Sequence, residues 1–216
     1  MTRTTLPMPL ADLRETLFGD LPLATYGVGQ TGAPWMHFAA AAKSLECGDP
    51  AAAIAALQSV LAMVGLESRH ALQAWDALRQ LGVKPAANVG KRVLGVVLDV
   101  PVETGLDTLA AYADGTARYL NHAGSAIVWE APDDRLAAAI QNVVAEGQRI
   151  ATAIGPWQGA RPALPAGMTR LSMLTPSGLH FGQAPFDVLA REPMAAPLIG
   201  AGTQLMQALI GLASKS

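Results

Sequence analysis

The chain has 216 residues, of which 51% are hydrophobic and only 15% are charged, against a usual charged share of about 25%. This composition excludes a disordered chain and supplies enough apolar side chains for a buried core. The net charge of −2 and the scatter of single Lys and Arg residues are untypical of a nucleic-acid-binding protein, so we expect no nucleic-acid partner.

Several features bear on the compartment. Cys47 is the only cysteine, so no internal disulfide can form, as is typical of reducing compartments. Residues 1–17 contain two prolines and several charges but no apolar run of a signal peptide. The uncharged stretch 193–214 is interrupted by Gly, Pro and Gln and falls short of the about 20 apolar residues of a membrane span. We therefore expect a cytoplasmic protein with no membrane partner. The excess of Arg over Lys, with abundant Ala, suggests a bacterial genome rich in GC.

The first part of the chain is helical. Apolar residues at three- and four-residue spacing predict a three-helix segment, with a short helix before it over residues 9–18 and a loop rich in Gly and Pro over 19–34. Asp49 and Pro50 are typical of a helix start, as N-cap and first helical residue. The three helices are predicted over residues 35–46, 50–66 and 68–81. Because residues 50–66 carry no charge, we expect that helix to lie inside the protein or beneath a partner.

The pattern then changes to that of a β-sheet. Residues 92–100 form a run rich in valine, and two further runs flank Asp114-Gly115, a dipeptide favoured in tight hairpin turns. A second turn at Ala123-Gly124 leads into residues 125–130. This pattern predicts a four-stranded antiparallel meander. The alternative is a helix over residues 105–120, because Ala, Leu and Tyr occur in both structures.

The remainder predicts a long helix from about residue 132 to 154, a stiff connector over 155–167, a hairpin over 169–183 and a last helix over 194–213. The fold class is therefore α+β, with an antiparallel sheet of about six strands and helices packed on it, preceded by the three-helix segment. The domains are residues 1–84 and 85–216, or one domain over 1–216.

The meander supplies the candidate catalytic residues. If both turns are two-residue loops, the alternation of side chains places Asp107, His122 and Ser125 in a row on one face. An aspartate can orient a histidine that activates a serine hydroxyl. A cross-strand Asp–His pair and a serine in a turn are also ordinary features of a sheet. No G-x-S-x-G motif accompanies them.

The same register suggests candidate ligand-binding residues. It places Arg118 opposite Trp129, so that the guanidinium could stack on the indole, and it turns Tyr119 to the other face. His180 lies in the short stretch 175–182, which also carries turn residues and hydroxyls. The candidate ligand-binding residues are Arg118, Tyr119, Trp129 and His180.

No cofactor or metal site is expected. The stretch Gly27–Gly32 matches G-x-G-x-x-G, but a proline precedes it where a strand is needed and Pro34 delays the following helix, so a flexible loop is favoured. The four histidines are far apart in the sequence, and nothing near Cys47 would activate its thiol.

The last helix has an apolar surface broader than one packing seam requires. It is either sandwiched in the core or used for self-association or partner binding. The candidate interface residues are Leu198, Leu205, Met206, Leu209 and Ile210.

The favoured function is a non-catalytic interaction, scaffold or adaptor protein that self-associates or docks a protein partner. Its basis is the low charge, the uncharged helices and the lack of a specific catalytic motif. The alternative is a small-molecule enzyme or ligand-binding protein that uses the polar residues Asp107, His122 and Ser125 at the rim of the sheet. Whether the chain is an enzyme is left open, with a non-enzyme favoured.

Overall fold

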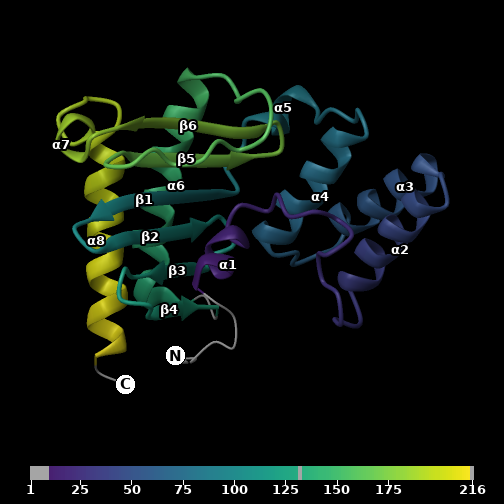
Figure 1. Cartoon of the computed structure of the whole chain (residues 1–216), viewed down its shortest axis with the longest axis horizontal. Coiled ribbons are helices and arrows are strands. Elements are labelled where there is room, and N and C mark those ends of the chain that lie inside the picture. Colours follow the sequence, from purple (N-terminus) through teal and green to yellow (C-terminus); the bar gives the residue numbers. More distant parts are fainter. Residues whose placement is uncertain (1–9, 131–132, 215–216) are drawn as a thin grey trace.

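The computed structural model describes residues 10–130 and 133–214 and contains a six-stranded antiparallel sheet with helices on both faces (Figure 1). The strand order is β4-β3-β2-β1-β5-β6, so the first strand lies near the middle and pairs with both hairpins. The strands are β1 (Gly95–Val102), β2 (Gly105–Tyr112), β3 (Ala117–Leu120), β4 (Ala126–Trp129), β5 (Thr169–Thr175) and β6 (Gly178–Ala184).

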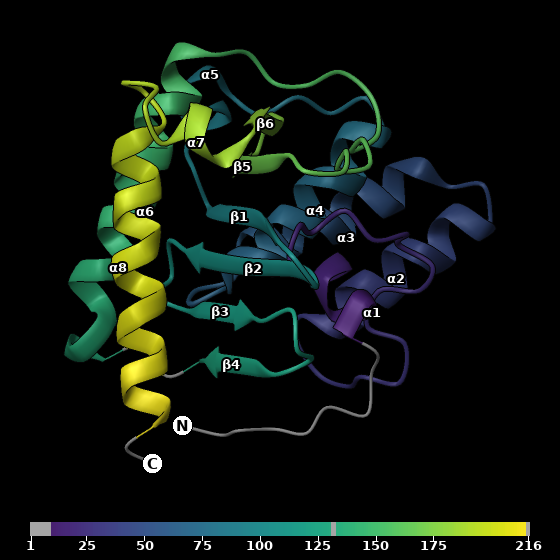
Figure 2. The ribbon, with the colours of Figure 1, turned by 60° about the vertical axis from the view of Figure 1, so that its left-hand side comes forward.

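Two long helices cover one face of the sheet (Figure 2). They are α6 (Asp134–Ala153) and α8 (Ala196–Ala213), and the short helix α7 (Phe186–Leu189) precedes α8. A Cβ atom added to Gly147 of α6 would lie 2.5 Å from Val96 Cγ2, and one added to Gly202 of α8 would lie 2.7 Å from Leu98 Cδ2. Both helices therefore depend on glycine for their close approach to β1.

The other face packs against the N-terminal part of the chain. Leu17, Phe18 and Leu72 share a core with Val97 of β1, and the buried Tyr112 hydroxyl donates a 2.8 Å hydrogen bond to the Leu17 carbonyl. The helices on this side are α1 (Leu10–Glu15), α2 (Trp35–Glu46), α3 (Pro50–Leu61), α4 (Ser68–Gln80) and the short α5 (Ala87–Gly90). Figure 2 shows α1 to α4 across the sheet from α6 and α8.

The helices α2, α3 and α4 form a small core of their own, which includes Phe38 and Leu57. As predicted, Asp49 caps α3 by accepting a hydrogen bond from the Ala52 N–H, and Pro50 is its first residue. Tyr26 and Trp35 pack their rings against this core, and the Tyr26 hydroxyl lies 2.7 Å from His70 Nδ1.

A side chain from a turn of the sheet caps the N-terminus of α4. The Asp114 carboxylate, in the turn after β2, accepts a 2.6 Å hydrogen bond from the Ser68 N–H, and the Asp114 N–H donates to the Ser68 hydroxyl. Burial alone would raise the pKa of Asp114, but these bonds and those from Thr116 hold it below its usual value. The charged carboxylate thus satisfies the first turn of α4, which carries no acidic residue of its own.

The α+β fold class and the predicted meander are confirmed, and the alternative helix over residues 105–120 is wrong. The predicted helix over 35–46 matches α2, whereas the one over 50–66 ends at Leu61. The short helix predicted over 9–18 is observed as α1 but ends at Glu15, and residue 9 lies outside the described residues. The division at residue 84 stays a prediction.

The predicted register is wrong by one residue. Thr108 pairs with Leu120 and Ala117 with Trp129, because both turns have three residues instead of two. Gly115 and Gly124, at φ +86° and +88°, occupy the left-handed third position of each loop. A type I turn followed by a left-handed glycine is a common three-residue hairpin connection. The shift moves Arg118 and Leu120 to the face opposite Asp107.

We expect Gly147→Ala to lower the free energy of unfolding by about 1–2 kcal/mol, because the clash with the stiff Val96 side chain exceeds the gain in helix propensity. Gly200→Ala in α8 is the matched control, since nothing lies within 4 Å of its Cβ position. That change should raise the free energy of unfolding by about 0.5–1 kcal/mol. Urea denaturation measures both, and a stabilised Gly147→Ala protein would contradict the close packing of α6.

Candidate functional site

A polar cluster lies at the rim of the sheet around Asp107 of β2. The Asp107 carboxylate accepts hydrogen bonds from the Tyr119 hydroxyl (2.8 Å) and the His122 N–H (2.8 Å), and it lies 2.9 Å from His122 Nδ1. Asp107 and His122 are therefore in contact, although not as the directly opposed cross-strand pair of the predicted register, because His122 is the first residue of the turn between β3 and β4. Tyr119 joins them because the shifted register turns it to their face.

These bonds favour the charged form of Asp107. Partial burial acts in the opposite direction, but the hydrogen bonds from His122 and Tyr119 hold the pKa of Asp107 below its usual value. Burial and the bond to Asp107 raise the pKa of Tyr119 to about 12. At neutral pH the cluster thus holds an ionised carboxylate and a protonated phenol.

Ser125 does not complete a catalytic triad. Its N–H donates to Asn121 Oδ1, and in the described part of the chain no hydrogen bond joins its side chain to His122. Ser125 and Asn121 line a separate cavity of about 230 Å³, beside Tyr119 and the end of α8. Among the described residues, His122 thus has an orienting carboxylate but no hydrogen-bonded nucleophile.

The predicted stacking of Arg118 on Trp129 is wrong. Arg118 lies on the face toward the N-terminal helices, 5.9 Å from the centre of the Tyr112 ring, and bonds to Glu130 at 3.0 Å. Trp129 faces the other layer, where the Arg135 guanidinium lies 4.9 Å from its ring centre. Arg118 is 3% exposed, and its Nη1 has no hydrogen-bond partner among the described residues.

His180 contacts neither the cluster around Asp107 nor Arg118 or Trp129. It is buried in β6, where its Nδ1 lies 3.1 Å from the Ile154 carbonyl oxygen and its Nε2 lies 3.4 Å from the Ser177 hydroxyl. Burial lowers the pKa of His180, although the Ile154 carbonyl opposes the change. The β5–β6 turn that contains Ser177 packs against α4 and α5 rather than against the meander, through Ser177 N–H to the Gly90 carbonyl.

Asp99 also lies away from Asp107. It pairs with Thr108, so it faces the N-terminal side of the sheet, and it accepts a 2.7 Å hydrogen bond from the Thr108 hydroxyl. Burial raises the pKa of Asp99, while Arg170, Arg161 and Arg14 act against this rise.

A larger cavity, of about 590 Å³, is lined by residues of α4, the β5–β6 hairpin and the connector before β5. We call it the α4 cavity. Its volume lies within the range usual for ligand sites, and it forms where the N-terminal helices meet the sheet. The polar and aromatic residues in its wall are Phe18, Asp20, Asp76, Arg79, Gln80, Trp157, Gln158, Arg161, Thr175 and Ser177.

The charged groups of the α4 cavity are paired with each other. Arg79 bonds to Asp76 (2.8 Å) and to the Pro176 carbonyl (2.9 Å), and Arg161 bonds to Asp20 (2.8 Å). Burial raises the pKa of Asp76 and lowers that of Arg79, while their attraction opposes both changes. The four charged side chains of the wall therefore form two ion pairs, and the wall carries no net charge.

Trp157 is a large and exposed apolar side chain in the wall of the α4 cavity. It is 48% exposed, its indole N–H donates to the Ala160 carbonyl, and its ring packs edge-on against Phe181 at 5.3 Å. The prediction from sequence missed this residue. A tryptophan in a connector rich in Gly and Pro is an unusual combination that could have drawn attention to it.

The candidate interface on α8 divides into two parts. Three of the residues are fully buried and belong to the core between α8 and the sheet, namely Leu198, Leu205 and Leu209. Met206 is half-buried and Ile210 is exposed, and for these two an interface stays a prediction. In the described part of the chain, α8 alone has the length and composition to cross a membrane, a property that core helices of soluble proteins share.

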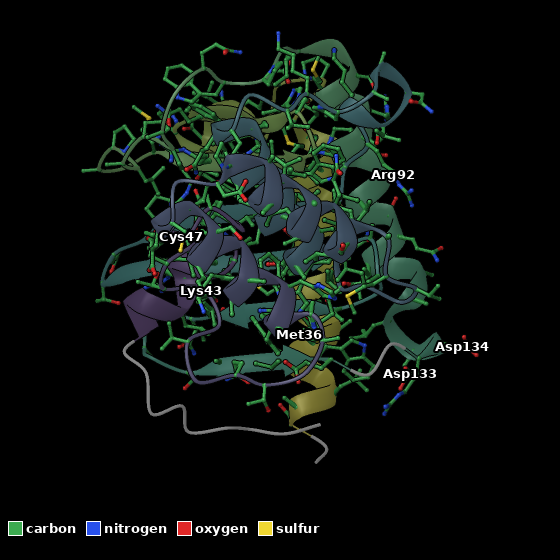
Figure 3. All side chains as sticks on the ribbon, turned by 90° about the vertical axis from the view of Figure 1, so that its right-hand side faces the viewer. Met36, Lys43, Cys47, Arg92, Asp133 and Asp134 are labelled. Atoms are coloured by element: carbon green, nitrogen blue, oxygen red, sulfur yellow. The ribbon has the colours of Figure 1, made fainter. Side chains whose placement is uncertain are left out.

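No metal site is evident within the described residues, since no three His, Cys, Asp or Glu side chains gather there. Cys47 is exposed at the end of α2 (Figure 3). The Gly27–Gly32 stretch forms turns without a strand before it, in agreement with the predicted loop.

No protein-family model, curated protein or solved structure matches the chain.

We expect Asp107→Asn to remove part of the acid sensitivity of the fold. Because its folded pKa is depressed, the Asp107 carboxylate adds stability above its unfolded pKa of about 3.9, and this contribution is lost as the pH falls through the folded value. The substitution should lower the free energy of unfolding by about 1 kcal/mol at pH 7, with a smaller difference at pH 3.

Chemical denaturation at a series of pH values measures this effect. Glu103→Gln is the control, because Glu103 is exposed in the turn between β1 and β2. Wild-type and Asp107→Asn proteins with the same pH dependence would contradict the proposed role of the three hydrogen bonds.

Proposed function

We propose that this protein is a non-catalytic binding protein that docks a segment of a protein partner in the α4 cavity. The observation that carries the proposal is the position of Trp157, which is half exposed in the wall of a cavity of about 590 Å³. Tryptophan is enriched among the side chains that contribute most to protein–protein binding.

The wall of the α4 cavity suits an uncharged peptide segment. Its two arginines and two aspartates are already paired, so a strongly charged ligand would have to compete with ion pairs within the chain. The Gln80 and Gln158 side chains carry both donors and acceptors, as does a peptide backbone. Trp157 provides an exposed apolar surface for a side chain of the partner, and the buried Phe18 and Leu72 belong to the same wall.

The rim cluster supports a non-catalytic role. His122 has an orienting carboxylate, but Ser125 makes no hydrogen bond with it in the described part of the chain. Asp107 already accepts hydrogen bonds from Tyr119 and His122. These bonds give the cluster a structural role, because they hold β2 to the end of β3.

We expect Trp157→Ala to weaken capture of the partner by at least about tenfold, since loss of an aromatic residue that dominates an interface costs about 2 kcal/mol or more. Phe186→Ala is the matched control, because Phe186 is similarly exposed (44%) but lies in α7, next to the helices on the other face of the sheet. Tagged wild-type and variant proteins would be incubated with extract of the source organism, and the bound proteins quantified by mass spectrometry.

A protein retained by wild type and Phe186→Ala but depleted with Trp157→Ala supports the proposal. Equal recovery with all three proteins would contradict it. The thermal midpoint of each variant shows whether it is folded. Gln158→Ala tests the same wall without removing the indole hydrogen bond to Ala160.

A further inference from the structure

A second cavity, of about 280 Å³, lies between the sheet and α8, on the face away from the α4 cavity. Its wall is mostly apolar and comes from the strands β1, β2, β3 and β5 and from α7 and α8, with Leu98, Leu109, Leu171, Ile199 and Met206 as its main apolar residues. Phe186 also lines the cavity and is 44% exposed, so the cavity is open to the protein surface. We call it the α8 cavity.

One buried hydroxyl in this wall has no hydrogen-bond partner in the part of the chain that the structure describes. Thr169, the first residue of β5, is fully buried, and its Oγ1 makes no hydrogen bond within the described residues. Thr169 belongs to the same face of β5 as Leu171, and both line the α8 cavity. A buried hydroxyl without a partner is unfavourable by about 1–3 kcal/mol, so a group that satisfies it would bind with an advantage.

The other polar groups of the α8 cavity define the charge of a suitable ligand. Asp107 and Tyr119 lie in its wall, and the Asp107 carboxylate is kept ionised by its bonds to His122 and Tyr119. An anionic ligand would meet this negative charge in a mainly apolar surrounding, where repulsion is strong. A neutral ligand avoids this penalty.

The size of the cavity also bears on the ligand. An apolar cavity of about 150 Å³ is enough to bind benzene, so about 280 Å³ accommodates a somewhat larger molecule, of roughly ten non-hydrogen atoms. Gly202 lets the backbone of α8 lie close to Leu98 at one side of the wall. The cavity thus lies directly beside the close contact between α8 and β1.

From these observations we propose that the α8 cavity binds a small neutral molecule with a mainly apolar body and one hydroxyl or carbonyl oxygen, which hydrogen-bonds to Thr169. This site is separate from the α4 cavity and does not depend on the function proposed above.

Octan-1-ol and octanoate are suitable probes, because they share an alkyl chain and differ in the charge of the head group. Each would be titrated into the full chain by isothermal titration calorimetry. We expect saturable binding of octan-1-ol with one site and at least tenfold weaker binding of octanoate. This comparison uses only the wild-type protein, so it stands even if a variant fails to fold.

Thr169→Val and Ser172→Ala form a matched pair of variants. Both remove a buried hydroxyl that has no partner among the described residues, from the same strand, but Ser172 faces the opposite side of the sheet. Thr169→Val should weaken octan-1-ol binding about three- to tenfold without lowering the thermal midpoint, and Ser172→Ala should leave the binding unchanged. Trp157→Ala should also bind octan-1-ol as wild type does.

No saturable binding of octan-1-ol by the wild-type protein would overturn the proposal. Equal affinity of wild type and Thr169→Val would overturn the role of the hydroxyl, and octanoate binding as tightly as octan-1-ol would overturn the preference for a neutral ligand. An effect of Trp157→Ala on octan-1-ol binding would show that the probe occupies the α4 cavity instead, which also overturns the proposal.

Discussion

The left-handed backbone of Gly115 and Gly124 determines which side of the sheet each residue of the meander faces. Each glycine closes a three-residue turn, and the two turns together set the pairing of β2, β3 and β4. Because side chains alternate along a strand, a shift by one residue would exchange the two faces. Tyr119 would then leave Asp107, and Arg118 would enter the apolar layer beneath α8. Both the rim cluster and the α8 cavity depend on these two turns.

The two faces of the sheet have different chemistry. The face toward α6 and α8 is mainly apolar, and its polar side chains include Asp107 at the rim and the buried Thr169 and His180. The face toward the N-terminal helices buries Asp99, Arg118 and Arg170, each with hydrogen bonds to neighbouring groups. Buried charge of this kind requires partners at defined positions. The two cavities differ in the same direction: the α4 cavity has a wall with two ion pairs, whereas the α8 cavity has a mainly apolar wall.

Local signals in the sequence predict the elements but not the sites. The helix of residues 35–46 and the cap at Asp49 follow from spacing and from side chains a few residues apart, which is why both are confirmed. The Asp114-Gly115 dipeptide is compatible with a two-residue and a three-residue turn, so the sequence leaves the register ambiguous by one position. The α4 cavity depends on contacts such as Arg161 with Asp20, which lie 141 residues apart in the chain. No periodic pattern encodes such a contact.

The low charge of the chain has a structural explanation, and this explanation weakens composition as evidence for a partner. A sheet covered on both faces needs apolar residues on both sides of its central strands, and β1 is buried from Gly95 to Asp99. The α2–α4 bundle adds a further core. Much of the apolar composition is therefore used within the chain, so composition alone is weak evidence for a partner. The stronger evidence is local: an exposed tryptophan lies in the wall of one cavity, and in the wall of the other lies a buried hydroxyl that has no hydrogen-bond partner among the described residues.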